Sequence, residues 1–246
     1  AVLGGALAGA GGLLLPLIAM PVLMGAGLIV LAARFRPQGT DELIEQPQRV
    51  SVLDPRIRPF LAVGFLTYLV FSSIQTLFGF LIQDRFHLGA TATASVTAAY
   101  MVAVAVTMIL AQAVVVPRLT WGATSLVRRG LLLVLVSTSC LWLSSYVTFA
   151  VACVLLGLGM GLLAPGYNAG PTLELSAQEQ GSLAGLINAT NGAAYALAPI
   201  GSTALYGLSH GAPIILAGCL VGATCVLTMV HPRLRSAPHR SRAEDS

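Results

Sequence analysis

The strongest constraint on this sequence is an apolar run from Leu131 to Tyr167 that contains no charged residue. A single helix over the run would be roughly 55 Å long, at a rise of about 1.5 Å per residue. The hydrocarbon core of a bilayer is only about 30 Å thick. We therefore predict that the run folds back near Ser144–Tyr146 and forms two membrane-spanning helices, at about 127–145 and 148–168.

The composition of the whole chain agrees with a membrane environment. Apolar residues make up 56% of the 246 residues and charged residues only 9%, whereas soluble domains carry about 25% charged residues. Ionised side chains are costly in hydrocarbon and apolar ones are not. We predict an all-α fold, a polytopic membrane helix bundle whose first partner is the lipid bilayer.

Five other apolar stretches are long enough to span a bilayer, which takes about 20 residues per helix. We predict them at about 13–33, 59–83, 92–116, 182–208 and 212–230. A stub of an earlier helix and a turn at Gly9–Gly12 precede the first. The polar segments that connect or follow these spans are 34–58, 84–88, 117–130, 169–181, 209–211 and the tail 231–246.

The basic residues predict the orientation of the bundle. All 13 are arginines, and the fold-back places every one except Arg85 on the same side of the membrane. These are Arg34, Arg36, Arg49, Arg56, Arg58, Arg118, Arg128, Arg129, Arg233, Arg235, Arg240 and Arg242. By the positive-inside rule this side is cytoplasmic, so we expect an integral protein of the bacterial inner membrane with a cytoplasmic C-terminus.

The layout of spans, long charged loop and basic tail resembles the second part of a major facilitator superfamily transporter. The likeness is clearest from Phe149 to Gly218, where a Gly-rich helix (LLGLGMGLLAPGYN) leads through Glu179–Gly181 into a helix rich in small residues (GSLAGLINATNGAAYALAPIGSTALYG). These two resemble the tenth and eleventh helices of drug-efflux members. Ala1–Gly5 is weakly similar to the end of the antiporter motif on their fifth helix.

The resemblance implies four regions. Residues 1–33 would end the N-terminal half with a stub and the sixth helix, and 34–58 would be the cytoplasmic interdomain loop. Residues 59–230 would form the C-terminal six-helix bundle, and 231–246 a cytoplasmic tail. Transporters of this kind bind substrate between two six-helix halves.

The function implied is that of part of a secondary transporter, incomplete as given, which exports small molecules by alternating access. Its partners would be a small-molecule substrate and the missing N-terminal helices. The alternative is a non-transporting six- or seven-helix membrane module, either a truncated product or a half that assembles with a partner.

Uncharged polar side chains on the spans are the candidate substrate-cavity residues. Several recur at helical spacing and share a face of one helix. By resemblance their helices line the central cavity; the other interpretation is hydrogen bonding between helices, which we favour for serine and threonine. The candidates are Tyr68, Ser72, Gln75, Tyr100, Thr107, Asn168, Asn188, Asn191 and Tyr195.

Other chemistry is not expected from this sequence. No acidic residue, lysine or histidine lies in the middle of a predicted span, so we expect no catalytic residue, no enzyme activity, no metal site and no cofactor. The pair Arg128–Arg129 is interpreted as an anchor at the membrane face, so no nucleic-acid partner is expected. Gly157 and Gly161 form a GxxxG pattern typical of close helix packing rather than of a nucleotide loop.

Overall fold

The computed structural model describes residues 14–34 and 48–235 of the chain, and every regular element in these residues is a helix. The predicted all-α fold class is therefore confirmed. The predicted stub and turn before the first span, most of the long charged loop and most of the tail lie outside the described residues. The helices are α2 (Leu14–Arg34), α3 (Arg58–Phe86), α4 (Ala90–Leu110), α5 (Ala123–Cys140), α6 (Tyr146–Thr172), α7 (Gln180–Leu208), α8 (Ala212–Val230) and the short α9 (Pro232–Arg235).

Two compact units divide the chain, residues 1–46 and 47–246. In the first, α2 is a 21-residue apolar helix that ends on Arg34, a favourable place for a cation because backbone carbonyls are unpaired at a helix C-terminus. The second unit contains α3 to α9, and the rest of the description concerns it.

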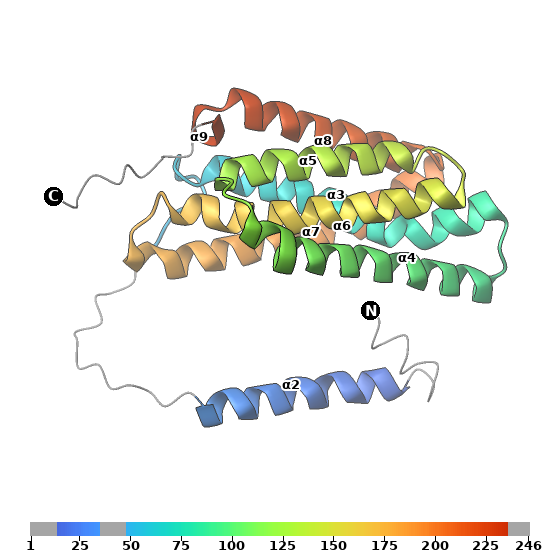
Figure 1. The fold of residues 1–246 in the computed structure, drawn as a ribbon, viewed down its shortest axis with the longest axis horizontal. Coiled ribbons are helices and arrows are strands. Elements are labelled where there is room, and N and C mark those ends of the chain that lie inside the picture. The colour runs from blue at the N-terminus through green and yellow to red at the C-terminus, as the bar shows by residue number, and fades with distance from the viewer. Residues whose placement is uncertain (1–13, 35–47, 236–246) are drawn as a thin grey trace. The chain divides into compact units, whose positions relative to one another are not determined.

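The helices α3 to α8 lie side by side and run in alternating directions along the length of the bundle (Figure 1). The central helix α6 packs against α5 on one side and α4 on the other, while α3 packs against α7, and α8 contacts both α3 and α5. Short turns join successive helices, as expected for neighbours that run antiparallel. At the first of these turns His87 caps α3 in a left-handed conformation, with φ of 51°.

The long apolar run folds back where the sequence predicts. α5 ends at Cys140, α6 begins at Tyr146, and Ser145 between them has an extended backbone. Thr148 holds the turn by donating from its hydroxyl to the carbonyls of Leu143 at 3.1 Å and Ser145 at 2.9 Å.

The segment predicted as a loop at 117–130 is mostly helical, which corrects the sequence interpretation. A π-helical turn at Ala111–Val115 and a 3₁₀ turn at Val116–Arg118 end α4, and α5 already begins at Ala123. Arg128 therefore lies inside α5. Its guanidinium donates to the carbonyl of Thr228 at 2.9 and 3.2 Å and to that of Leu234 at 2.9 Å, both near the end of α8.

Glycines of α6 permit close packing on two sides. A Cβ at Gly157 would overlap Thr107 Oγ1 and the Val104 carbonyl of α4, and one at Gly161 would lie 3.0 Å from the Met108 carbonyl. Gly159, between them in sequence, faces α5, where a Cβ would lie 2.9 Å from the carbonyl of Gly130. The Gly-x-Gly-x-Gly run thus serves two helix contacts.

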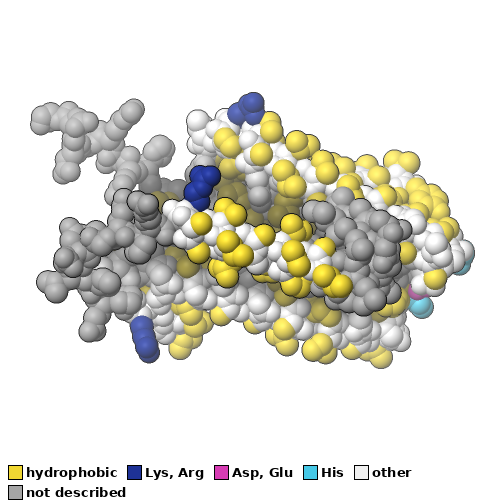
Figure 2. Space-filling view, turned by 90° about the horizontal axis from the view of Figure 1, so that it is seen from below, with side chains coloured by type: hydrophobic (Ala, Val, Ile, Leu, Met, Phe, Trp, Pro, Cys, Tyr) yellow, Lys and Arg dark blue, Asp and Glu magenta, His cyan; other side chains and the backbone are white. Residues whose placement is uncertain are grey.

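Five helices among the described residues are long and apolar enough to cross a membrane, namely Arg58–Phe86, Ala90–Arg118, Ala123–Cys140, Tyr146–Thr172 and Ala212–Val230. Helix α7, predicted as a further span, has 29 residues but is not in this group, since Gly, Ser, Thr and Asn are frequent in it. Figure 2 shows apolar side chains over the surface of the bundle. Its two ends differ in charge. Arg56, Arg58, Arg118 and Arg128 lie toward the end at which α3, α5 and α7 begin, and Asp84, Arg85, His87 and His210 lie at the other. We call these the arginine-rich end and the opposite end.

Candidate functional site

The packing of α3 against α7 brings together two of the predicted site residues. The ring centroids of Tyr68 on α3 and Tyr195 on α7 are 5.9 Å apart. Tyr167 of α6 joins them, with its centroid 6.0 Å from that of Tyr68, and both ring pairs are tilted by 55°. We call Tyr68, Tyr167 and Tyr195 the tyrosine cluster.

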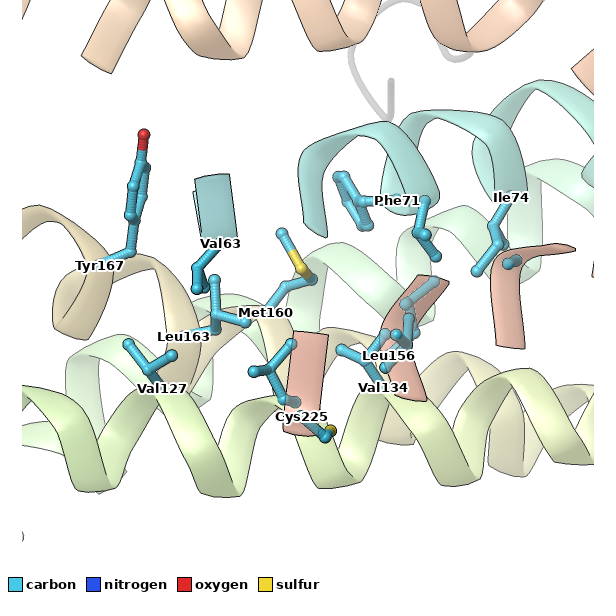
Figure 3. Close-up of a cluster of buried hydrophobic side chains, with 14 of the residues drawn as sticks. Val63, Phe71, Ile74, Val127, Val134, Leu156, Met160, Leu163, Tyr167 and Cys225 are labelled. Carbon is cyan, nitrogen blue, oxygen red and sulfur yellow. The ribbon is translucent and has the colours of Figure 1, made fainter. Parts of the chain in front are cut away.

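Tyr167 is the member that the sequence interpretation missed. Its side chain is fully buried, yet its hydroxyl has no hydrogen-bond partner. The phenol lies against Gly64 of α3, because a Cβ at Gly64 would overlap the ring. Figure 3 shows the ring extending away from Val127, with the hydroxyl at its far end. The available signal was a tyrosine next to Asn168, near the end of a long apolar stretch of α6.

Asn191 lies one helical turn before Tyr195 on the same face of α7. Its side-chain oxygen Oδ1 is buried and also has no hydrogen-bond partner. A buried polar atom left unpaired costs about 1–3 kcal/mol, so such atoms are rare in folded proteins and often mark a site for water or a ligand. Two of them, the Tyr167 hydroxyl and Asn191 Oδ1, occur on residues of the same α3–α6–α7 region.

The remaining candidates on α3, α6 and α7 lie at different depths. Gln75, Asn168 and Asn188 are exposed on the surface of the bundle, whereas Ser72 is buried one turn after Tyr68. These four residues lie on the same helices as the tyrosine cluster. Among the described residues, none of them forms a hydrogen bond with a member of the cluster.

The two candidates on α4 lie elsewhere, at its contact with α6. The hydroxyl of Tyr100 donates to the carbonyl of Tyr146 at 2.9 Å, and its ring lies 5.9 Å from that of Phe78. Thr107 donates to the carbonyls of its own helix, at 2.7 Å to Ala103 and at 3.1 Å to Val104. Both hydroxyls are therefore satisfied by backbone, and the structure does not bring these residues to the tyrosine cluster.

An ionic network ties the entry of α3 to the entry of α7 at the arginine-rich end. Arg56 Nη2 lies 2.7 Å from Glu179 Oε1 and 2.8 Å from Asp54 Oδ2. Glu179 Oε2 also accepts from the backbone and hydroxyl of Ser176, at 2.9 and 3.0 Å. The Arg56 guanidinium, and then the Ser176 backbone N–H, lower the pKa of the Glu179 carboxyl to about 2. Hydrogen bonds to Asp54, and then to Glu179, raise the pKa of Arg56 above its ordinary value.

A second polar group occupies the opposite end, where α3 stops and α7 turns into α8. The hydroxyl of Tyr206 donates to the Asp84 carboxylate, and His210 Nε2 lies 3.3 Å from Asp84 Oδ2. Arg85 does not pair with this carboxylate. It donates to the carbonyl of Leu141, and its guanidinium lies 5.8 Å from the ring centroid of Phe149.

Taken together, the apolar spans and the charges at or near their ends define a polytopic membrane protein. The sequence pattern of the Major Facilitator Superfamily matches residues 1–199 and, in a second and overlapping alignment, residues 60–245. The chain therefore belongs to this superfamily, whose members are typically transporters. No curated protein matches the chain. The predicted family is confirmed.

Proposed function

We propose that this chain is part of a secondary transporter that exports small molecules by alternating access, with α3 and α7 facing the substrate. The observation that carries the proposal is the tyrosine cluster. It lies in a bundle of apolar helices and is accompanied by two buried polar atoms without partners. In a family whose members are transporters, an aromatic and polar site between helices is suited to binding a ligand transiently.

The proposed working unit is a pair of six-helix halves, of which α3 to α8 form one. The exposed amides of Gln75 and Asn188 support this arrangement, because amide groups on a membrane-facing surface need polar partners that lipid does not offer. A second half would supply them and would enclose the substrate near the middle of the bilayer. Helices preceding α3 would contribute that half.

The proposed orientation places the arginine-rich end in the cytoplasm of a bacterial cell, by the positive-inside rule. Coupling to an ion as an antiporter is part of the same proposal. Asp84 and Glu179 lie at the two ends of the bundle, so we propose that a coupling carboxylate within the membrane would come from the other half.

Dye efflux from cells or inverted vesicles that carry the full-length transporter tests this proposal. Gln75→Ala and Asn191→Ala should each change the apparent substrate affinity without abolishing expression, and Leu208→Ala, a change at an exposed position at the end of α7, is the control. Unaltered transport in both amide variants would remove the assignment of the α3–α7 face to the substrate. Absence of transport by a well-expressed full-length protein would favour a non-transporting membrane module.

A further inference from the structure

We propose that the ligand of the tyrosine cluster is a small uncharged aromatic molecule that carries an N–H or O–H donor. This inference rests on the proposed transport function and specifies the substrate class. Three properties of the site carry it, namely the distribution of charge along its helices, the exposed aromatic rings and the two unpaired polar atoms.

The first property is the lack of charge around the cluster. No acidic, basic or histidine residue occurs anywhere in α6 or α7, and none occurs in α3 between Arg58 and Asp84. Tyr68 is separated from these two residues by roughly 15 and 24 Å along the helix, at about 1.5 Å per residue. An ionised ligand between these helices would lose its hydration without gaining a counter-charge from them, which strongly disfavours its binding.

The second property is the aromatic surface that the cluster offers. Tyr195 is 42% exposed and Tyr68 is half-buried, so parts of both rings remain uncovered. The two rings are tilted relative to each other by 55°. A flat ring can pack against one face and present its edge to the other, the arrangement that aromatic pairs prefer.

The third property is the unpaired oxygen of Asn191. An amide oxygen only accepts hydrogen bonds, whereas the Tyr167 hydroxyl can either donate or accept. Both atoms are buried without a partner. A ligand with an N–H or O–H group satisfies Asn191 Oδ1, whereas a ligand without a donor leaves it unpaired. Selection for a donor follows from that difference, since leaving a buried polar group unpaired is what discriminates most strongly between analogues.

Four benzene derivatives of similar size separate these properties. Benzamide is neutral and has a donor, methyl benzoate is neutral without one, benzoate is an anion and benzamidinium is a cation. Binding of each to the full chain in lipid nanodiscs is measured by saturation-transfer NMR and competition. We expect benzamide to bind at least tenfold more tightly than either ion and several-fold more tightly than methyl benzoate.

A charge change at Asn191 provides the matched test. Asn191→Asp should reverse the order of affinities and make benzamidinium the most tightly bound probe. Gln112→Glu, which also turns an amide into a carboxylate but lies at an exposed position in the turn that ends α4, should leave the order unchanged. Tyr167→Phe keeps the ring and the Asn191 acceptor, so it should leave the order of the four probes unchanged. Circular dichroism shows which variants are folded.

Equal binding of benzamide and benzoate, no binding of any probe, or no change of order in folded Asn191→Asp would each overturn the inference. The proposed function is judged separately by dye efflux. Efflux that depends on Gln75 and Asn191, together with indifference to probe charge, would uphold transport and reject only the substrate class.

Discussion

Arg56 and Glu179 show how a single ion pair can organise one end of a membrane bundle. The two residues are far apart in sequence, and their contact links the segment before α3 to the segment before α7. The hydroxyl of Ser182 adds to this link by accepting from the backbone N–H of Val50 at 2.9 Å. Because both helices also meet at the tyrosine cluster, the ionic network fixes the ends of the same helix pair that carries the candidate site.

We expect the Glu179 carboxylate to make a contribution to the stability of the folded protein that is lost in acid. Its pKa in the folded protein, about 2, lies below the ordinary value of 4.5. A carboxyl with a lowered pKa stabilises the folded state above its unfolded pKa, and this contribution is lost as the pH falls from about 4.5 toward 2. We expect wild-type protein in nanodiscs to lose thermal stability across this window more steeply than Glu179→Gln.

Glu174→Gln, a change of the other glutamate between α6 and α7, is the control for this pH profile. In this variant thermal stability should fall with pH as steeply as in the wild type, because Glu179 and its ion pair with Arg56 are still present. If Glu179→Gln kept the full slope between pH 4.5 and 2, the ion pair would not be the source of the acid sensitivity.

Of the three residues in the tyrosine cluster, two could be predicted from the sequence and one could not. Tyr68 and Tyr195 were predicted because each belongs to a polar stripe with helical spacing, a local pattern that one helix reveals by itself. Tyr167 has no such stripe, and its position depends on Gly64 of a helix about a hundred residues earlier. Tyr100 and Thr107 share a heptad spacing, but their hydroxyls are bonded to backbone, which spacing alone does not indicate.

At the scale of the helices, the contact between α4 and α6 depends on the absence of a side chain at Gly157. Gly157→Ala would gain up to about 1 kcal/mol of helix propensity but would push a methyl group into Thr107 Oγ1 and the Val104 carbonyl. Overpacking of this kind costs about 1–3 kcal/mol, and a backbone carbonyl cannot rotate away. We therefore expect a net loss of stability, measured by thermal unfolding in detergent.

Gly185→Ala on α7 is the matched change, since nothing lies within 4 Å of a Cβ built there. It should leave the stability unchanged or raise it slightly. Equal effects of the two changes would mean that α4 and α6 do not pack as closely as the geometry at Gly157 requires.

We expect Arg128 to stabilise the C-terminal end of α8. Its guanidinium donates to the Thr228 and Leu234 carbonyls, which would otherwise be among the unpaired groups at a helix C-terminus. Arg128→Ala should lower stability by about 1–3 kcal/mol and should speed proteolysis after α8. Arg118→Ala is the control, because Arg118 donates to the Val114 carbonyl of the preceding helical turn at 2.7 Å and not to the end of α8. A similar effect of both changes would contradict the capping role.

These helix contacts also explain which boundaries the sequence could predict. The fold-back at residues 141–145 follows from length, because the apolar run exceeds any single span. The start of α5 was placed too late because two arginines looked like a loop. Their charges are accommodated by partners that a local pattern does not show. Arg128 donates to the Thr228 carbonyl in the last turn of α8, and Cζ of Arg129 lies 3.4 Å from the ring centroid of Trp121.

At the scale of the whole molecule, the orientation in the membrane can be inferred from the end of the α3 to α8 bundle at which the arginines lie. Arg56, Arg58, Arg118 and Arg128 lie at or near helix ends that meet at the arginine-rich end, whereas Arg85 lies at the opposite end. The potential across a membrane and the insertion machinery both favour basic loops in the cytoplasm. The two ends should therefore differ in their access to reagents that cannot cross the bilayer.

Single cysteines introduced at the two ends measure this difference, after the native Cys140, Cys153, Cys219 and Cys225 are replaced by serine or alanine. A membrane-impermeant maleimide should label Ser209→Cys in intact cells and Ser176→Cys only after permeabilisation, since both positions are exposed. Labelling in the reverse order would invert the proposed orientation. Equal labelling of both in intact cells would contradict a bundle that spans the membrane from end to end, because the length of α7 separates the two positions.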